Sequence, residues 1–329
     1  MKRIAIVLIA GVAVVSVLLA LAVVLGAPQP PPPMKSINAP FRSVDFSDLT
    51  QLKRYTARDE TRLAFRAYAP AASPAQGSAV LIHGSSASSN SLHPLARGLA
   101  QAGYAVYALD MRGHGESGPK GQITYIGQLE DDVEDFLEAV QPAGPRTLVG
   151  FSSGGGFALR FAASSRQQPF DQYVLLAPFI HRDAPTYRPG SGGWVAAGVA
   201  RIIALTFLNR FGITRFNTLP VLAFALTAEA QQFLTPTYSY ALATNFRAHD
   251  DYRADIGAAK QPLHLLVGQD DEVLYADQFS AMFEEAGRPV PVTLLPGVEH
   301  VDITLQPAAI QAITEAVESF RDGESPESP

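Results

Sequence analysis

The chain has 329 residues, a net charge of −6 and no cysteine. Its length is sufficient for one large α/β domain with a buried core. The net charge argues against nucleic-acid binding, because no basic surface is available to neutralise phosphates. The absence of cysteine excludes disulfides, thiolate nucleophiles and cysteine-ligated metals.

The N-terminus begins with two basic residues, Lys2 and Arg3, followed by an uncharged run from Ile4 to Ala27. About 20 apolar residues in a helix cross the hydrocarbon core of a bilayer. We therefore predict that residues 1–27 form a signal-anchor or transmembrane helix that contacts the membrane. The remainder would lie on the non-cytoplasmic side, periplasmic or extracellular. A cleaved signal peptide followed by secretion is the alternative, because Ala20-Leu21-Ala22 resembles a cleavage site.

A Pro-rich linker is expected at residues 28–40, because Gln29 to Pro33 reads Gln-Pro-Pro-Pro-Pro. Such a stretch forms a stiff, extended spacer rather than packed structure. A globular pattern begins at about residue 41. At the other end, residues 323–329 predict a disordered tail.

Strands and helices alternate along the globular part. Short apolar runs bounded by turn residues predict buried strands, and amphipathic segments predict helices. The predicted strands are 63–68, 79–82, 104–109, 147–149, 173–176, 263–267 and 290–295. The predicted helices are 91–102, 125–140, one starting near 153, 276–286 and 308–320. This alternation predicts an α/β fold with a mostly parallel central sheet and helices on both faces.

The alternation is interrupted over residues 179–250, which contain Trp194, the single tryptophan, and an apolar stretch around Val195 to Leu208. An inserted helical cap over the sheet is the natural interpretation. The cap would divide the core into a first part, 41–178, and a second part, 251–322.

A candidate nucleophile lies in Gly150-Phe151-Ser152-Ser153-Gly154, which fits the pattern G-x-S-x-G. The segment follows a predicted buried strand and precedes a predicted helix, which is the setting that a nucleophile elbow requires. Such a turn is strained, so the residues two before and two after the serine must be very small. Ser152 would also lie at a helix N-terminus, where free N–H groups favour developing negative charge.

The candidate base is His300, one of seven histidines. It lies in a loop directly after the predicted strand that ends at Leu295, late in the chain. We expect structural roles for His83 beside the strand end and for His114 in a glycine-rich turn, and a core position for His264. A surface or cap role is the default for the remaining three, His93, His181 and His249.

The acid that orients the histidine should follow a strand between Ser152 and His300. Three carboxylates, Asp270, Asp271 and Glu272, follow the predicted strand 263–267. The chain order alone does not choose among them. Asp110 also ends a strand, but it precedes the serine, so we expect a structural role for it.

An oxyanion intermediate needs two hydrogen-bond donors. One candidate is the backbone N–H of Ser153, directly after the nucleophile. The second should come from the small-residue turn His83-Gly84-Ser85-Ser86, where we favour the backbone N–H of Ser85 over that of Ser86.

These motifs resemble those of α/β-hydrolases of the serine aminopeptidase, monoglyceride lipase and lysophospholipase-like group. The matching segments are His83-Gly84, the run Asp110 to Ser117, Gly150 to Gly155, Gly268 to Asp271, and Gly297 to His300. In that group the acid is the fourth residue of a Gly-x-x-Asp turn, which implies Asp271 rather than Asp270. The group's oxyanion donor follows the His-Gly pair, which implies Ser85.

The expected activity is hydrolysis of carboxylic esters through an acyl-enzyme, with Ser152, His300 and Asp271 as a triad and neither cofactor nor metal. The substrate is expected to be a small-molecule lipophilic ester, such as a monoacylglycerol or lysophospholipid, since the cap is apolar. An aminopeptidase or amidase with the same triad is the alternative, with Glu229 as one conceivable amine ligand. A catalytically silent, membrane-tethered binding protein is a third hypothesis.

Overall fold

The computed structural model describes residues 2–319, without the side chains of residues 2–8, 35 and 38. Its centre is an eight-stranded sheet in the order β1-β2-β4-β3-β5-β6-β10-β11. The strands are β1 (Leu52–Thr56), β2 (Arg62–Tyr68), β3 (Ser78–Ile82), β4 (Ala105–Leu109), β5 (Arg146–Phe151), β6 (Gln172–Leu176), β10 (Leu263–Gly268) and β11 (Val292–Leu295). Neighbours from β4 to β11 pair in parallel, whereas β1 with β2 and β2 with β4 pair antiparallel. The predicted mostly parallel sheet is therefore confirmed.

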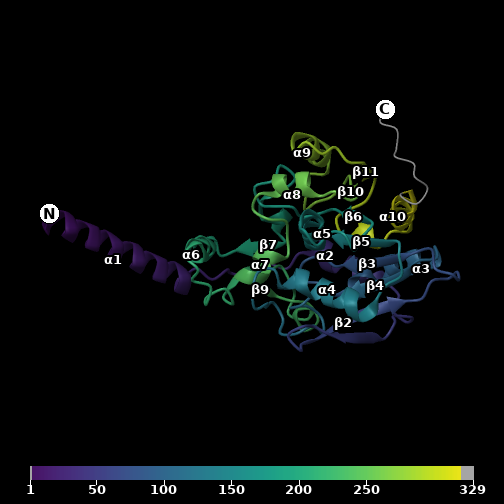
Figure 1. Cartoon of the computed structure of the whole chain (residues 1–329), viewed down its shortest axis with the longest axis horizontal. Coiled ribbons are helices and arrows are strands. Elements are labelled where there is room, and N and C mark those ends of the chain that lie inside the picture. The colour runs from purple at the N-terminus through teal and green to yellow at the C-terminus, as the bar shows by residue number, and fades with distance from the viewer. Residues whose placement is uncertain (1, 320–329) are drawn as a thin grey trace.

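Helices flank this sheet (Figure 1). They are α3 (His93–Gln101), α4 (Gln128–Val140), α5 (Ser153–Ala163), α8 (Tyr252–Ala258), α9 (Phe279–Glu285) and α10 (Pro307–Ser319). Short 3-10 helices lie at 40–43, 89–92, 189–193, 230–232, 276–278 and 302–304. The seven predicted strands and the helices predicted between them are all present, with ends shifted by a few residues. Strand β1 was missed because Lys53 and Arg54 leave it without an apolar run.

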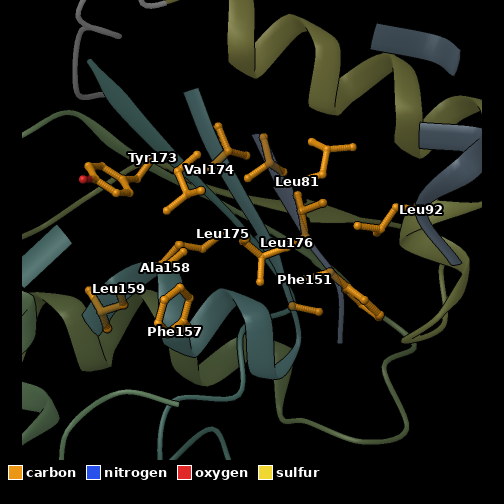
Figure 2. Packing of buried hydrophobic residues seen from close by; sticks show 14 of the residues in the cluster. Leu81, Leu92, Phe151, Phe157, Ala158, Leu159, Tyr173, Val174, Leu175 and Leu176 are labelled. Carbon is orange, nitrogen blue, oxygen red and sulfur yellow. The ribbon is translucent and has the colours of Figure 1, made fainter. Parts of the chain in front are cut away.

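The core lies where the central strands meet the helices. Every residue of β3 and β6 is buried, as expected for parallel strands that are covered on both sides. In Figure 2, Val174 to Leu176 of β6 lie beside Phe157, Ala158 and Leu159 of α5. Because β3 and β6 are fully buried, the loops that follow their carboxyl ends are held in fixed positions.

The segment 179–250 is not purely helical, which corrects the prediction of a helical cap. It contains a separate antiparallel sheet of β7 (Val195–Ala197), β8 (Pro220–Phe224) and β9 (Thr237–Ser239), together with helices α6 (Val199–Arg210) and α7 (Tyr240–Asn245). These strands are only three to five residues long, too short to show a clear alternating pattern. Their apolar residues were therefore indistinguishable from helical ones.

At the N-terminus, α1 (Lys2–Leu25) packs against α6. From there α1 extends away from the rest of the molecule (Figure 1). The Arg201 guanidinium of α6 donates hydrogen bonds to the carbonyls of Val23 (2.8 Å) and Val24 (3.0 Å). The predicted linker is not wholly extended, because a short helix, α2 (Lys35–Asn38), lies within it. Nearby, the Met34 N–H donates to the Ala225 carbonyl in the cap (3.0 Å).

The prediction of a transmembrane helix at 1–27 is not supported. Within the described part of the chain, no helix combines the length and the apolar character needed to cross a membrane. The predicted disordered tail, 323–329, lies outside the described residues.

Candidate active site

The turn between β5 and α5 carries Ser152, with φ 53° and ψ −119°. The residues two positions before and two positions after it must be glycine for steric reasons. A Cβ at Gly150 would lie 2.3 Å from the Gly154 carbonyl oxygen, and one at Gly154 would lie 2.4 Å from the His83 carbonyl oxygen. The predicted requirement for very small residues on both sides of the serine is therefore met. The strained turn holds the hydroxyl at the carboxyl end of β5.

The structure brings together the three side chains predicted to form the triad. The Nε2 atom of His300 lies 3.0 Å from Oγ of Ser152, and its Nδ1 lies 2.7 Å from Oδ2 of Asp271. All three residues are buried, with exposed fractions of 7% for Ser152, 4% for His300 and 1% for Asp271. Donation of the Nδ1 proton to the carboxylate leaves Nε2 free to accept the serine proton.

The loop after β10 distinguishes Asp271 from its neighbours. Oδ1 of Asp271 accepts the backbone N–H groups of Val273 (2.8 Å) and Leu274 (2.7 Å), which orients Oδ2 toward the imidazole. Asp270 is exposed and contributes only its backbone N–H, to the Val298 carbonyl (3.2 Å). Of the two aspartates, Asp271 alone contacts His300 through its side chain.

Glu272, the third of the carboxylates that follow β10, is a further acidic neighbour of the histidine. Its Oε2 accepts the backbone N–H of His300 (3.0 Å). Burial by itself lowers the pKa of His300, but the charge and hydrogen bond of Asp271 and the charge of Glu272 outweigh it. The pKa of His300 is therefore raised above its usual value of 6.5.

The two predicted oxyanion donors face the same cavity as Ser152, since Ser85 and Ser153 both line it. The loop after β3 runs directly beside the nucleophile, because a Cβ at Gly84 would lie 3.2 Å from Cβ of Ser152. Among the described residues, no acceptor is found for the backbone N–H of Ser85 or of Ser153. Both donors are thus free to bind an oxyanion.

Asp110, His83 and His114, for which structural roles were expected, make contacts within the loops that follow β3 and β4. Asp110 accepts the backbone N–H groups of Ser89 (2.7 Å) and Glu116 (2.9 Å), as expected for a loop-fixing residue. His83 and His114 are fully buried and bond to backbone carbonyls of their own loops, which also agrees with the expectation.

For the other histidines, the default surface or cap role is wrong for His93, which is fully buried in the core between the Tyr68 hydroxyl and Asp48. His181 lines the cavity, and His249 pairs with Asp255 (2.8 Å). His264 is half-buried in β10.

A cavity of about 400 Å³ opens at Ser152 beneath the cap. Its apolar wall includes Ile202 on α6, Leu222 and Phe224 on β8, and Ala243 on α7. Its titratable lining consists of His181, Arg182, Asp183, Arg210, Arg247 and Asp250. Glu229, considered as an amine ligand, is exposed and lies outside the cavity lining.

No group of three or more histidine, aspartate or glutamate side chains within the described residues is arranged to hold a metal ion.

Two cap residues that sequence reasoning missed contact the oxyanion loop. Nε1–H of Trp194 donates to Oγ of Ser85 (3.0 Å), and the Tyr238 hydroxyl accepts the Ser86 N–H (2.6 Å). Only their aromatic character in an otherwise featureless segment could have drawn attention to them.

A comparison with protein families matches residues 73–303 to the family described as serine aminopeptidase, S33. That range covers most of the chain. The chain belongs to this hydrolase family. The resemblance drawn from the motifs is thereby confirmed, and with it an α/β-hydrolase fold.

Among curated proteins, the chain is similar to the monoacylglycerol lipase of Mycolicibacterium smegmatis. The two are 36% identical over 126 residues, which are 36% of this chain and 44% of that protein. The uncharacterized protein YnbC of Escherichia coli is 28% identical over 276 residues, 75% of this chain and 43% of that protein. The chain thus matches less than half the length of these relatives.

Solved structures share the fold at lower identity. A soluble variant of the Saccharomyces cerevisiae monoglyceride lipase has a TM-score of 0.65 and 18% identity, covering 85% of this chain and 98% of the other. A putative aryl esterase of Burkholderia cenocepacia has a TM-score of 0.58 and 20% identity, covering 83% and 100%.

Proposed function

We propose that this S33 hydrolase cleaves carboxylic esters through an acyl-enzyme on Ser152. The observation that carries the proposal is the continuous line of hydrogen bonds from Asp271 through His300 to Ser152. Ser152 in turn lines a cavity with an apolar wall. A serine hydroxyl is a weak nucleophile unless a neighbouring base removes its proton. His300, neutral and oriented by Asp271, supplies that base.

In the first half-reaction, Nε2 of His300 takes the Ser152 proton as Oγ attacks the ester carbonyl carbon. The N–H groups of Ser85 and Ser153 hold the carbonyl oxygen as it becomes negative. The imidazolium then donates its proton to the departing alcohol, which leaves an acyl-serine. In the second half-reaction His300 takes a proton from water, hydroxide adds to the acyl carbon, and the acid leaves as Ser152 regains its proton.

The substrate we propose is a lipophilic ester, such as a monoacylglycerol, a lysophospholipid or a medium-chain acyl ester. The cap walls formed by Ile202, Leu222 and Phe224 favour an apolar chain, because its burial there removes hydrocarbon from water. Two of the similar proteins are named a monoacylglycerol lipase, from M. smegmatis, and a monoglyceride lipase, from S. cerevisiae.

The amidase alternative would need unpaired carboxylates to bind a free amine. The two acids of the cavity, Asp183 and Asp250, are accompanied by three arginines, so no excess negative charge is present there. Asp250 is already paired with Arg247 (2.7 Å), which favours an ester substrate over a peptide with a free N-terminus.

Labelling with a fluorophosphonate probe tests the proposal directly. The wild-type chain should be labelled, and Ser152→Ala should not, while both retain the same circular dichroism spectrum. A folded wild-type chain that neither reacts with the probe nor hydrolyses any ester would instead support the catalytically silent binding protein.

A panel of nitrophenyl esters tests the acyl group. We expect kcat/KM to rise from acetate toward medium-chain esters, as more apolar surface is buried. Activity on acetate alone would contradict the lipophilic substrate and leave the esterase proposal intact. An aminoacyl-nitroanilide in the same panel tests the amidase alternative.

We also propose that the catalytic domain is exported to the non-cytoplasmic side of the membrane. The basic residues Lys2 and Arg3, the apolar run behind them and the Pro-rich stretch support this. An alkaline phosphatase fusion after residue 329 should be active if this is correct, and inactive if the domain stays in the cytoplasm.

A further inference from the structure

A second chain of hydrogen bonds lies behind the oxyanion loop, separate from the triad. The backbone N–H of Ser86 donates to the Tyr238 hydroxyl oxygen (2.6 Å), and that hydroxyl also lies 2.6 Å from Nε2 of His114. All three residues are buried, with exposed fractions of 1% for Ser86, 2% for Tyr238 and 0% for His114. Because water is excluded, each polar group depends on its partner in this chain.

The direction of these bonds follows from the contacts of His114. Its Nδ1 faces the carbonyl oxygens of Met111 (3.3 Å) and Arg112 (3.2 Å), which only accept hydrogen bonds, so Nδ1 carries the proton. In the neutral ring Nε2 is then an acceptor, and the Tyr238 O–H donates to it. Burial and the neighbouring His83 hold the pKa of His114 well below its usual value, so the ring stays neutral.

The loop that receives this support has a strained conformation. Ser86 has φ 68°, in the left-handed region that residues with a Cβ disfavour. The cap strand β9 and the residues before it hold Ser86 in that conformation. Its Oγ donates to the Thr235 carbonyl (2.7 Å), and its own carbonyl accepts the Thr235 N–H (2.8 Å).

Ser85, the predicted oxyanion donor, directly precedes this anchored residue. The peptide plane between Ser85 and Ser86 is fixed by the Ser86 N–H, so the bond to Tyr238 limits rotation of the Ser85 backbone. The Ser85 side chain is also held by the cap, through Trp194. The two side chains that bond to Ser85 and Ser86, those of Trp194 and Tyr238, therefore both belong to the cap.

We propose that Tyr238 is a positioning residue for the oxyanion hole. Its hydroxyl, oriented by His114, holds the Ser85–Ser86 peptide and so limits rotation of the Ser85 backbone, which keeps the N–H of the preceding Gly84–Ser85 peptide pointing at the carbonyl oxygen of the substrate. The inference rests on the proposed ester hydrolysis. It adds that a cap residue on β9 affects how well the oxyanion of the reaction is stabilised. The oxyanion hole is complete only while β9 is seated on the loop.

Tyr238→Phe tests the role of the hydroxyl, because it keeps the ring that lines the cavity. Complete loss of an oxyanion donor costs roughly 10²–10³-fold in kcat, so loosening one should cost about 10- to 100-fold. KM for a medium-chain nitrophenyl ester should change by less than about twofold, since ground-state binding is untouched. The affinity for a trifluoromethyl ketone, whose adduct on Ser152 carries an oxyanion, should fall in parallel with kcat/KM.

Tyr173→Phe is the matched control. It removes another buried tyrosine hydroxyl, which donates to the Gln167 carbonyl (2.8 Å) in the core. Both variants should lower Tm, because each leaves a buried polar group without a partner. Only Tyr238→Phe should lower kcat. Equal losses of Tm with kcat unchanged in both would overturn the positioning role, and so would an increase in KM with kcat unchanged.

If Tyr238→Phe does not fold, His114→Phe decides the question, because it removes the acceptor that orients the Tyr238 hydroxyl and keeps an aromatic ring. A fall in kcat with KM unchanged supports the inference, and an unchanged kcat overturns it. An inactive wild-type chain that fluorophosphonate does not label would overturn the proposed function as well. An active wild-type chain with a fully active Tyr238→Phe variant would overturn only this inference.

Discussion

The hydrolase core and the cap hold their functional residues in different ways. In the core, Ser152, Asp271 and His300 each follow a strand of the central sheet, and backbone hydrogen bonds or steric limits set their orientation. In the cap, the groups that face the site are side chains on short elements. Part of that region is exposed and apolar, as at Ile203 and Phe211. The core therefore supplies the chemistry, and the cap supplies the shape of the cavity.

The two regions are nevertheless joined at the oxyanion loop. Core residues build the turn after β3, while the side chains of Tyr238 and Trp194 and the backbone carbonyl of Thr235, all from the cap, bond to it. A change in the cap can thus alter turnover without contacting the triad. Variants in each region should separate these contributions, since core variants should change kcat and cavity variants should change the choice of acyl group.

The largest effect is expected for Ser152→Ala in the core. Removal of the nucleophile should lower kcat by about 10⁴–10⁶-fold, because no covalent intermediate can form. Initial rates on a medium-chain nitrophenyl ester measure this loss. The cavity should be unaffected, so a non-hydrolysable substrate analogue should bind as tightly as to the wild-type chain. Substantial residual turnover would mean that Ser152 is not the nucleophile.

Asp271→Asn should reduce kcat by about 10⁴-fold, because the amide no longer enforces the Nδ1–H tautomer of His300. Asp270→Asn is the matched control, since its side chain is exposed and does not contact His300. Steady-state kinetics on both variants test the choice between the two aspartates. A larger loss at 270 than at 271 would reverse the assignment.

This contrast also explains what could be predicted from sequence. Ser152 and the region of Asp271 and His300 were predictable because each motif follows a recognisable strand, and parallel strands end at one edge of a sheet. Choosing Asp271 over Asp270 required the family resemblance, whereas in the structure the hydrogen bonds of Val273 and Leu274 distinguish the two aspartates. Tyr238 and Trp194 were missed, because their role depends on tertiary contacts over more than a hundred residues.

In the cap, Ala243→Phe should narrow the apolar part of the cavity. We expect kcat/KM for medium-chain esters to fall about tenfold, corresponding to roughly 1–3 kcal/mol for space lost in a hydrophobic pocket. Acetate should be hydrolysed at the wild-type rate, so it serves as the internal control. An equal loss on both esters would place the acyl chain elsewhere and weaken the division between core and cap.

A smaller effect is expected in the pH dependence of kcat/KM. His300 acts as a base only when neutral, and its pKa is raised, so activity should be lost as the pH falls through a value above 6.5. Glu272→Gln removes one of the charges that stabilise the imidazolium while its amide oxygen can still accept the His300 N–H. The acidic limb should therefore move to lower pH, with little change in the plateau. An unmoved limb would mean that the charge of Glu272 does not act on His300.

Arg201→Met should change turnover least and stability measurably. The Arg201 guanidinium is buried and donates to the Val23 and Val24 carbonyls near the end of α1 and to Pro220 at the start of β8. Its loss leaves these carbonyls without their donor, which should lower the free energy of unfolding by about 1–3 kcal/mol. Arg210→Met on the exposed end of α6 should change it by less than about 0.5 kcal/mol. Denaturant titration of both variants measures the difference. Arg201 contacts neither the triad nor the oxyanion loop. A large loss of kcat would therefore mean that the packing of α1 against α6 affects the catalytic site through the cap.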